Sequence, residues 1–110
     1  MPQQVPSVSV DQLPDGATVL DVREPDEWAA GHAPDALHIP MGDLAARLDE
    51  LPADGNVYVV CRSGGRSARA TAYLNANGWE ATNVDGGMKS WHAAGRPMVS
   101  DPPGTEPEVI

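Results

Sequence analysis

The sequence predicts an α/β fold with a mainly parallel sheet. Short apolar segments alternate along the chain with segments of helical periodicity, which is the pattern of consecutive strand–helix–strand units. Residues 57–60, with the sequence VYVV, form a continuous apolar run that is typical of a strand buried on both faces of a parallel sheet. The chain has 110 residues, which is the usual length of one domain. We therefore expect one core around one sheet.

Four further strands are predicted by apolar or alternating segments between turn signals. Together with the run at 57–60, the five predicted strands comprise residues 5–10, 18–22, 36–39, 57–60 and 81–84. The segment nearest the N-terminus alternates in polarity, which is typical of an edge strand. Pro40 stops the third strand, and a tight Asp-Gly-Gly turn at 85–87 follows the last.

Four helices are predicted between and after the strands. They comprise residues 24–30, 43–51, 66–77 and 88–94. Pro25 suits the first position of a helix, and Asp43 is the expected N-cap of the second helix, which carries one apolar stripe. Gly78 is expected to stop the third helix. We assign residues 1–97 to the domain and residues 98–110 to a flexible, Pro-rich acidic tail.

Charge and cysteine content exclude several classes of function. The formal net charge of −9 argues against binding to nucleic acid or to an anionic membrane, because both need basic patches. No apolar run approaches the roughly 18 residues of a membrane-spanning helix. No basic residue precedes Arg23, so a secretion signal is not indicated and we expect a cytoplasmic protein. One cysteine and three histidines without ligand spacing predict no disulfide, no metal and no cofactor.

Cys61 is the best candidate for a nucleophile. It follows the predicted strand at residues 57–60 and begins the run CRSGGRS. Ligands of open parallel sheets bind beyond the carboxyl ends of the strands, where this residue is expected. Arginines and a helix N-terminus lower the pKa of a thiol, and glycines allow backbone N–H groups to form an anion-binding nest. A lone cysteine is often an inert core residue, but these neighbours disfavour that interpretation.

The residues after the cysteine are predicted to bind an anionic substrate. They are Arg62, Ser63, Gly64, Gly65, Arg66 and Ser67. The arginines would attract and orient the anion, and the serines add hydroxyl donors. Ser67 could also cap the following helix.

Three segments resemble the signatures of the rhodanese family of sulfurtransferases. The first is DVREPDEW at 21–28, followed by GHAP at 31–34 and HIP at 38–40; the second is VVCRSGGRSA at 59–68; the third runs from VDGGMKSW at 84–91 to GRP at 95–97. The resemblance covers about residues 5–97, and the three segments together, in this order and spacing, are specific. Rhodaneses commonly have Gly where Asp35 stands and an aliphatic residue where Ala33 stands.

The resemblance implies a three-layer sandwich with about five strands and a single-domain sulfurtransferase. Cys61 would take a sulfane sulfur from thiosulfate or a related persulfide donor and hold it as a persulfide. A thiol, protein or cyanide acceptor would then remove it. Asp21 and Arg23 would brace the loop, although a solvated ion pair is the alternative.

Other functions compete with this interpretation. Cysteine-dependent phosphatases share the fold but have a loop one residue longer, whereas Arg66 here lies five positions after Cys61. The smaller loop favours a persulfide sulfur over a phosphoryl group. The protein could also be a sulfur carrier for a biosynthetic partner, or an inactive interaction domain, which the complete loop disfavours. Donor, acceptor and oligomeric state stay open.

Overall fold

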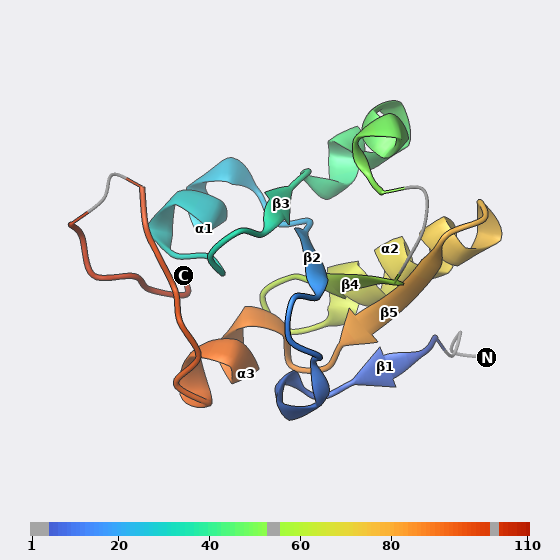
Figure 1. Ribbon diagram of the computed structural model, residues 1–110. Helices are drawn as coiled ribbons and strands as arrows, with labels where there is room; N and C mark the ends of the chain where they lie inside the picture. Colours follow the sequence, from blue (N-terminus) through green and yellow to red (C-terminus); the bar gives the residue numbers. More distant parts are fainter. Residues whose placement is uncertain (1–4, 53–55, 102–103) are drawn as a thin grey trace.

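A parallel sheet of five strands forms the centre of the computed structural model, which describes residues 5–52, 56–101 and 104–110 (Figure 1). The strands are β1 (Ser7–Val8), β2 (Thr18–Asp21), β3 (Leu37–His38), β4 (Asn56–Val60) and β5 (Glu80–Val84). They lie in the order β1-β5-β4-β2-β3, and every pair is parallel. The predicted α/β class and the parallel sheet are confirmed.

Helices connect the strands. They are the α-helices α1 (Pro25–Ala30), α2 (Gly65–Ala76) and α3 (Gly87–Ala93), and the 3₁₀ helices η1 (Val10–Gln12) and η2 (Met41–Glu50). Pro25 occupies the first turn of α1, and Gly78 follows α2 with a φ of 97°, as their residue types predict.

The helix predicted at residues 43–51 is present, but its predicted start and N-cap are wrong. The segment is the 3₁₀ helix η2, which begins at Met41 after Pro40 and has a kink at Arg47. Its start is fixed by the preceding strand region, because the N–H of Met41 donates to the carbonyl of Val22 and the N–H of Asp43 donates to that of Pro40. Asp43 therefore lies inside the first turn and is not the cap.

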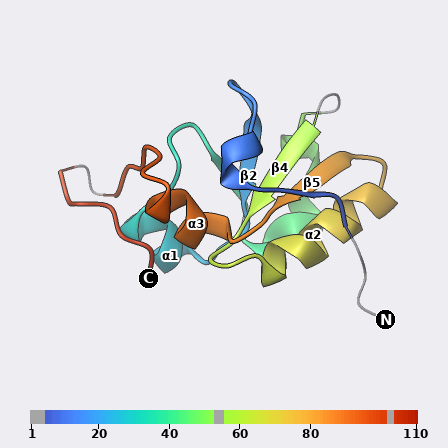
Figure 2. The same cartoon turned by 90° about the horizontal axis from the view of Figure 1, so that it is seen from below.

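The two faces of the sheet carry separate apolar clusters, because side chains alternate along a strand. In β4, Val57 and Val59 pack with Leu74 of α2 and Leu44 of η2. Val60 points the other way and packs with residues of α3 and of the N-terminal segment. Figure 2 shows α2 and α3 apart from each other on either side of the strands. Each buried aliphatic side chain contributes about 1.5–3 kcal/mol to the burial term. The sheet is thus held between helices.

The C-terminal segment lies beside α1 (Figure 1). The backbones of His32 and Val99 form an antiparallel bridge, and the N–H of Glu108 donates to the carbonyl of Ala30 at 2.8 Å. Gly31 makes this approach possible: a Cβ there would lie 2.5 Å from the backbone oxygen of Glu108. The segment is therefore seated on the domain, while the predicted boundary at 97 and its flexibility stay predictions. No helix in the described ranges is long and apolar enough to cross a membrane.

Candidate active site

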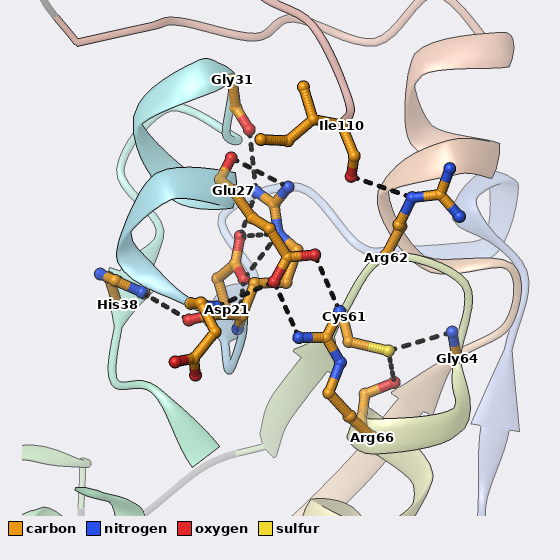
Figure 3. Close-up of polar contacts among 12 residues, drawn as sticks. Asp21, Glu27, Gly31, His38, Cys61, Arg62, Gly64, Arg66 and Ile110 are labelled. Atoms are coloured by element: carbon orange, nitrogen blue, oxygen red, sulfur yellow. Dashed lines mark hydrogen bonds and ion pairs between the residues drawn. The ribbon is translucent and has the colours of Figure 1, made fainter. Parts of the chain in front are cut away.

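Cys61 lies directly after β4, at the carboxyl edge of the sheet, as predicted (Figure 3). Residues 61–64 form a loop that leads into α2. Gly64 turns the chain with a φ of 116°, a conformation that favours glycine. The loop therefore folds back over the cysteine, and the first residues of α2 come close to its sulfur atom.

Hydrogen bonds from the loop converge on the sulfur. The N–H of Gly64 lies 3.0 Å from Sγ, and the hydroxyl of Ser67 lies 3.3 Å from it. Burial of the Cys61 thiol raises its pKa, but these donors, with the N–H groups of Ser63 and Ser67, outweigh burial and lower the pKa below its ordinary value. The residue is only 1% exposed. The arrangement is that of a recessed thiol that is prepared for ionisation.

The N-terminus of α3 holds the outer side of the loop. The N–H of Met88 donates to the carbonyl of Cys61 at 2.8 Å, and the N–H of Lys89 donates to that of Arg62 at 3.0 Å. A Cβ on Gly87 would collide with the carbonyl oxygen of Cys61, and this glycine has a φ of 53°. Because the loop carbonyls are bound by α3, the loop N–H groups are left to face the sulfur. The close approach at Gly87, the first residue of α3, therefore helps to leave the N–H groups of the loop directed at the sulfur.

Arg66 is paired with an acidic residue that sequence reasoning did not select. Its two terminal nitrogens donate to Oε1 and Oε2 of Glu27 at 2.8 and 2.9 Å. The pair lowers the pKa of Glu27 to about 2 and raises that of Arg66. Glu27 belongs to the DVREPDEW segment, but nothing local in that segment points to a partner 39 positions later. The charge of Arg66 is thus largely compensated inside the protein.

Asp21 and Arg23 form a buried ion pair of 2.7 Å, and both are fully buried. Arg23 also donates to the carbonyls of Glu27 and Gly31, at 3.2 and 2.8 Å. These bonds attach the pair to α1 and to the end of that helix. The pair therefore reaches the loop through α1 and Glu27, and also through the backbone, because Asp21 is paired with Val60 of β4 and the N–H of Val22 donates to the carbonyl of Val60 at 3.1 Å. Its loop-supporting role stays a prediction, now with an indirect path.

Trp28 further fixes α1. Its ring stacks on the ring of His32, with centroids 3.6 Å apart, and on that of His38, with centroids 4.6 Å apart. The imidazole of His32 also contacts the carbonyl of Trp28 at 2.7 Å. In the described ranges, no group of three or more His, Cys, Asp or Glu is placed to bind a metal.

A family model for the rhodanese-like domain matches residues 8–94. The chain belongs to the rhodanese-like domain family. A sulfurtransferase of Allochromatium vinosum is 41% identical over 104 residues, which are 91% of this chain and 97% of that protein. A rhodanese-related protein of Thermoplasma volcanium has a solved structure with a TM-score of 0.81 and 35% identity, over 86% of this chain and 97% of that one. The solved structure of a thiosulfate sulfurtransferase of Pseudomonas aeruginosa has a TM-score of 0.75 and 28% identity, over 87% of this chain and 20% of that one.

The residues predicted to bind the substrate differ in their contacts with Sγ of Cys61. Gly64 and Ser67 contact the sulfur, whereas Arg66 faces Glu27. Ser63 and Arg62 are exposed, and Nε of Arg62 donates to the carbonyl of Ile110 at 2.9 Å. Of the two loop glycines, Gly64 has a positive φ, whereas Gly65 is the first residue of α2 and does not. Substrate binding by these residues stays a prediction.

The structure also shows the surroundings of Asp35 and Ala33, the two positions where the sequence departs from the common rhodanese pattern. Asp35 has a φ of 65°, and it is the one non-glycine residue with a positive φ in the part of the chain that the structure describes. This explains why glycine is common at the position in rhodaneses. Ala33 is buried, at 1% exposure. A surface cavity of about 530 Å³ lies near Asp35 and the start of β2, and none of its lining residues belongs to the loop.

Proposed function

We propose that the protein is a sulfurtransferase that carries sulfur as a persulfide on Cys61. The observation that carries the proposal is the placement of two groups that can donate to an ionised Sγ, the N–H of Gly64 at 3.0 Å and the hydroxyl of Ser67 at 3.3 Å. Such donors stabilise a thiolate and, after loading, the anionic terminal sulfur of a persulfide in the same electrostatic way as an oxyanion hole. Membership of the rhodanese-like family and the likeness to sulfurtransferases support the proposal.

The first half of the cycle loads the enzyme. The thiolate of Cys61 attacks the outer sulfur of thiosulfate, the new S–S bond forms, and the old S–S bond breaks. Its electron pair leaves with sulfite, so that thiosulfate and thiolate give persulfide and sulfite. A related persulfide donor would release a thiolate in place of sulfite.

The second half unloads the sulfur. An acceptor thiolate or cyanide attacks the terminal sulfur of the persulfide, and the electron pair of the broken bond returns to Cys61 as a thiolate. The chain has no second cysteine, so the acceptor must be another molecule. A double displacement of this kind predicts ping-pong kinetics.

Two other functions are less well supported. The loop from Cys61 to Arg66 is one residue shorter than the phosphatase loop, and Arg66 is engaged by Glu27, which disfavours phosphoryl transfer. A sulfur carrier with little free turnover would use the same site, and turnover separates it from an enzyme. Steady turnover of thiosulfate with cyanide or a thiol supports an enzyme, whereas a stable persulfide with negligible turnover supports a carrier.

The decisive experiment is mass spectrometry of the protein after treatment with thiosulfate. We expect the mass to rise by one sulfur atom, with the addition on Cys61 and its removal by cyanide or a thiol. A Cys61→Ser variant serves as the matched control and should gain nothing. Sulfur transfer by that variant, or no addition to the folded wild-type protein from either thiosulfate or a persulfide donor, would overturn the proposal.

A further inference from the structure

Asn83 of β5 lies behind the active-site loop, although no motif of the sequence singled it out. Its side-chain oxygen accepts a hydrogen bond of 2.6 Å from the hydroxyl of Ser67, and the same hydroxyl lies 3.3 Å from Sγ of Cys61. All three residues are buried, at 5%, 0% and 1% exposure in the order Asn83, Ser67 and Cys61. They therefore form a short buried chain of polar groups that ends on the reactive sulfur.

The backbone fixes both ends of this chain. Asn83 is paired with Val59 in the adjacent strand β4, and its N–H donates to the carbonyl of Pro6 at 2.8 Å. Ser67 lies in the first turn of α2, where its carbonyl accepts a hydrogen bond of 2.7 Å from the hydroxyl of Thr71. Because strand and helix hold the two backbones, the remaining freedom is the rotation of the hydroxyl and of the amide.

The hydroxyl of Ser67 has one proton and two acceptors. The shorter contact, to Asn83, indicates that the proton points there. This arrangement suits a neutral thiol, because the S–H of Cys61 can then donate to the free lone pairs of the Ser67 oxygen. The chain of donors runs from sulfur to hydroxyl to amide oxygen.

Ionisation of the thiol reverses the direction of the hydrogen bond between Cys61 and Ser67. When the thiol proton has left to solvent, the sulfur accepts only, so the Ser67 hydroxyl must turn toward it. The amide oxygen of Asn83 would then face lone pairs of the hydroxyl oxygen. Rotation of the amide by half a turn places its NH₂ group there as a donor. Asn has a donor and an acceptor, so it can bond to Ser67 in both states, and the bond is stronger in the ionised state because a hydroxyl that donates to an anion accepts more strongly.

We propose that Asn83 is a positioning residue of the active site, which acts through the Ser67 hydroxyl to stabilise the thiolate and persulfide forms of Cys61. The thiolate part of the proposal stands apart from the reaction, whereas the persulfide part rests on the proposed function. A purely structural Asn83, which only ties α2 to β5, is the alternative. The two differ in whether the amide influences the sulfur.

Alkylation of Cys61 by iodoacetamide, followed as a function of pH, tests the proposal, because the thiolate is the reacting form. We expect Asn83→Leu to shift the pH profile of the alkylation rate to higher pH. Alkylation at neutral pH should slow by about three- to tenfold, which is the effect of weakening one hydrogen bond to a charged group. In a Ser67→Ala background the same substitution should add nothing, because the connecting hydroxyl is gone. This measurement needs no sulfur transfer, so its failure is separate from failure of the proposed function.

Asn75→Leu is the matched control. Asn75 ties α2 to β5 through hydrogen bonds of 2.7 and 3.0 Å between its side chain and the backbone of Ala81, at the end of α2 away from Cys61. We expect this variant to lose stability without a shift of the alkylation profile.

If Asn83→Leu does not fold, Asn83→Asp is the second variant, because Asp has nearly the same shape as Asn. Its carboxylate would hold the hydroxyl proton of Ser67 away from the sulfur and should shift the profile to still higher pH. A wild-type profile in the folded Asn83 variant, or an equal shift with and without Ser67, overturns the proposal.

Discussion

The carboxylate of Glu27 accepts two hydrogen bonds from the guanidinium of Arg66, of 2.8 and 2.9 Å (Figure 3). The contact joins α1 to the first turn of α2 and places a negative charge against one of the two loop arginines. Arg62 is exposed, and its Nε donates to the backbone oxygen of Ile110 at 2.9 Å. The two arginines therefore have different settings, which leads to separate expectations for each.

Loss of the Glu27 charge should change the stability of the protein in acid. The folded pKa of Glu27, about 2, is below its ordinary value of 4.5, so the ionised carboxylate stabilises the fold above pH 4.5. This contribution is lost as the pH falls from 4.5 toward 2. We expect Glu27→Gln to lower the free energy of unfolding near neutral pH by about 1 kcal/mol, because the pair is partly exposed.

Urea unfolding followed by tryptophan fluorescence measures this effect between pH 7 and 2.5. The difference between wild type and Glu27→Gln should shrink as the pH falls through that window. Glu50→Gln is the control, since the Glu50–Arg47 pair is exposed and adds little. A difference between wild type and Glu27→Gln that is constant with pH would contradict the role of the charge.

Removal of the exposed loop arginine should weaken the attraction of an anionic sulfur donor. We expect Arg62→Ala to lower kcat/KM for thiosulfate by about three- to tenfold at low salt, and the loss should decrease as salt screens the charge. Arg69→Ala is the matched control, because Arg69 is exposed on α2 and its removal changes the net charge equally. Equal losses in the two variants would show that only the net charge matters.

The seating of the C-terminal segment depends on the absence of a side chain at Gly31. An added Cβ would lie 2.5 Å from the backbone oxygen of Glu108 and 2.9 Å from the terminal methyl of Met98. We expect Gly31→Ala to displace the segment and to speed cleavage after Glu108 by a glutamate-specific protease, with loss of residues 109–110 seen by mass spectrometry. Gly42→Ala, whose Cβ would meet nothing within 4 Å, should be cleaved like wild type.

The same digestion tests the predicted flexibility of residues 98–110. Rapid cleavage after Glu108 in the wild-type protein would support a flexible tail. Slow cleavage that Gly31→Ala accelerates would support a seated one. Equal rates in wild type and Gly31→Ala would contradict the role assigned to Gly31.

Asp35 is held in a conformation that costs energy for a residue with a Cβ. Its φ is 65°, and glycine adopts this region without strain. We expect Asp35→Gly to raise the free energy of unfolding by about 0.5 kcal/mol, measured by thermal or urea unfolding. Asp15→Gly removes the same charge at an exposed turn position without a positive φ and should not stabilise. A destabilised Asp35→Gly variant would contradict the strain.

Secondary structure was predictable where one segment carries its own signal. The continuous apolar run of β4 is buried and central, and its end delivers Cys61 to the carboxyl edge of the sheet. The prediction was wrong at η2, because backbone hydrogen bonds from Met41 to Val22 set where that helix begins, and a capping pattern around Asp43 could not reveal them.

Local patterns in the sequence predict the α/β class, the place of Cys61 and the glycine turn that closes its loop, because strand periodicity and turn chemistry act over a few neighbouring residues. Long-range packing brings Glu27 to Arg66 and Asn83 to the Ser67 hydroxyl. Those pairs lie 39 and 16 positions apart, and their distances depend on how α1, α2 and β5 pack together. Hydrogen bonds require an approach of about 3 Å, which local pattern does not specify.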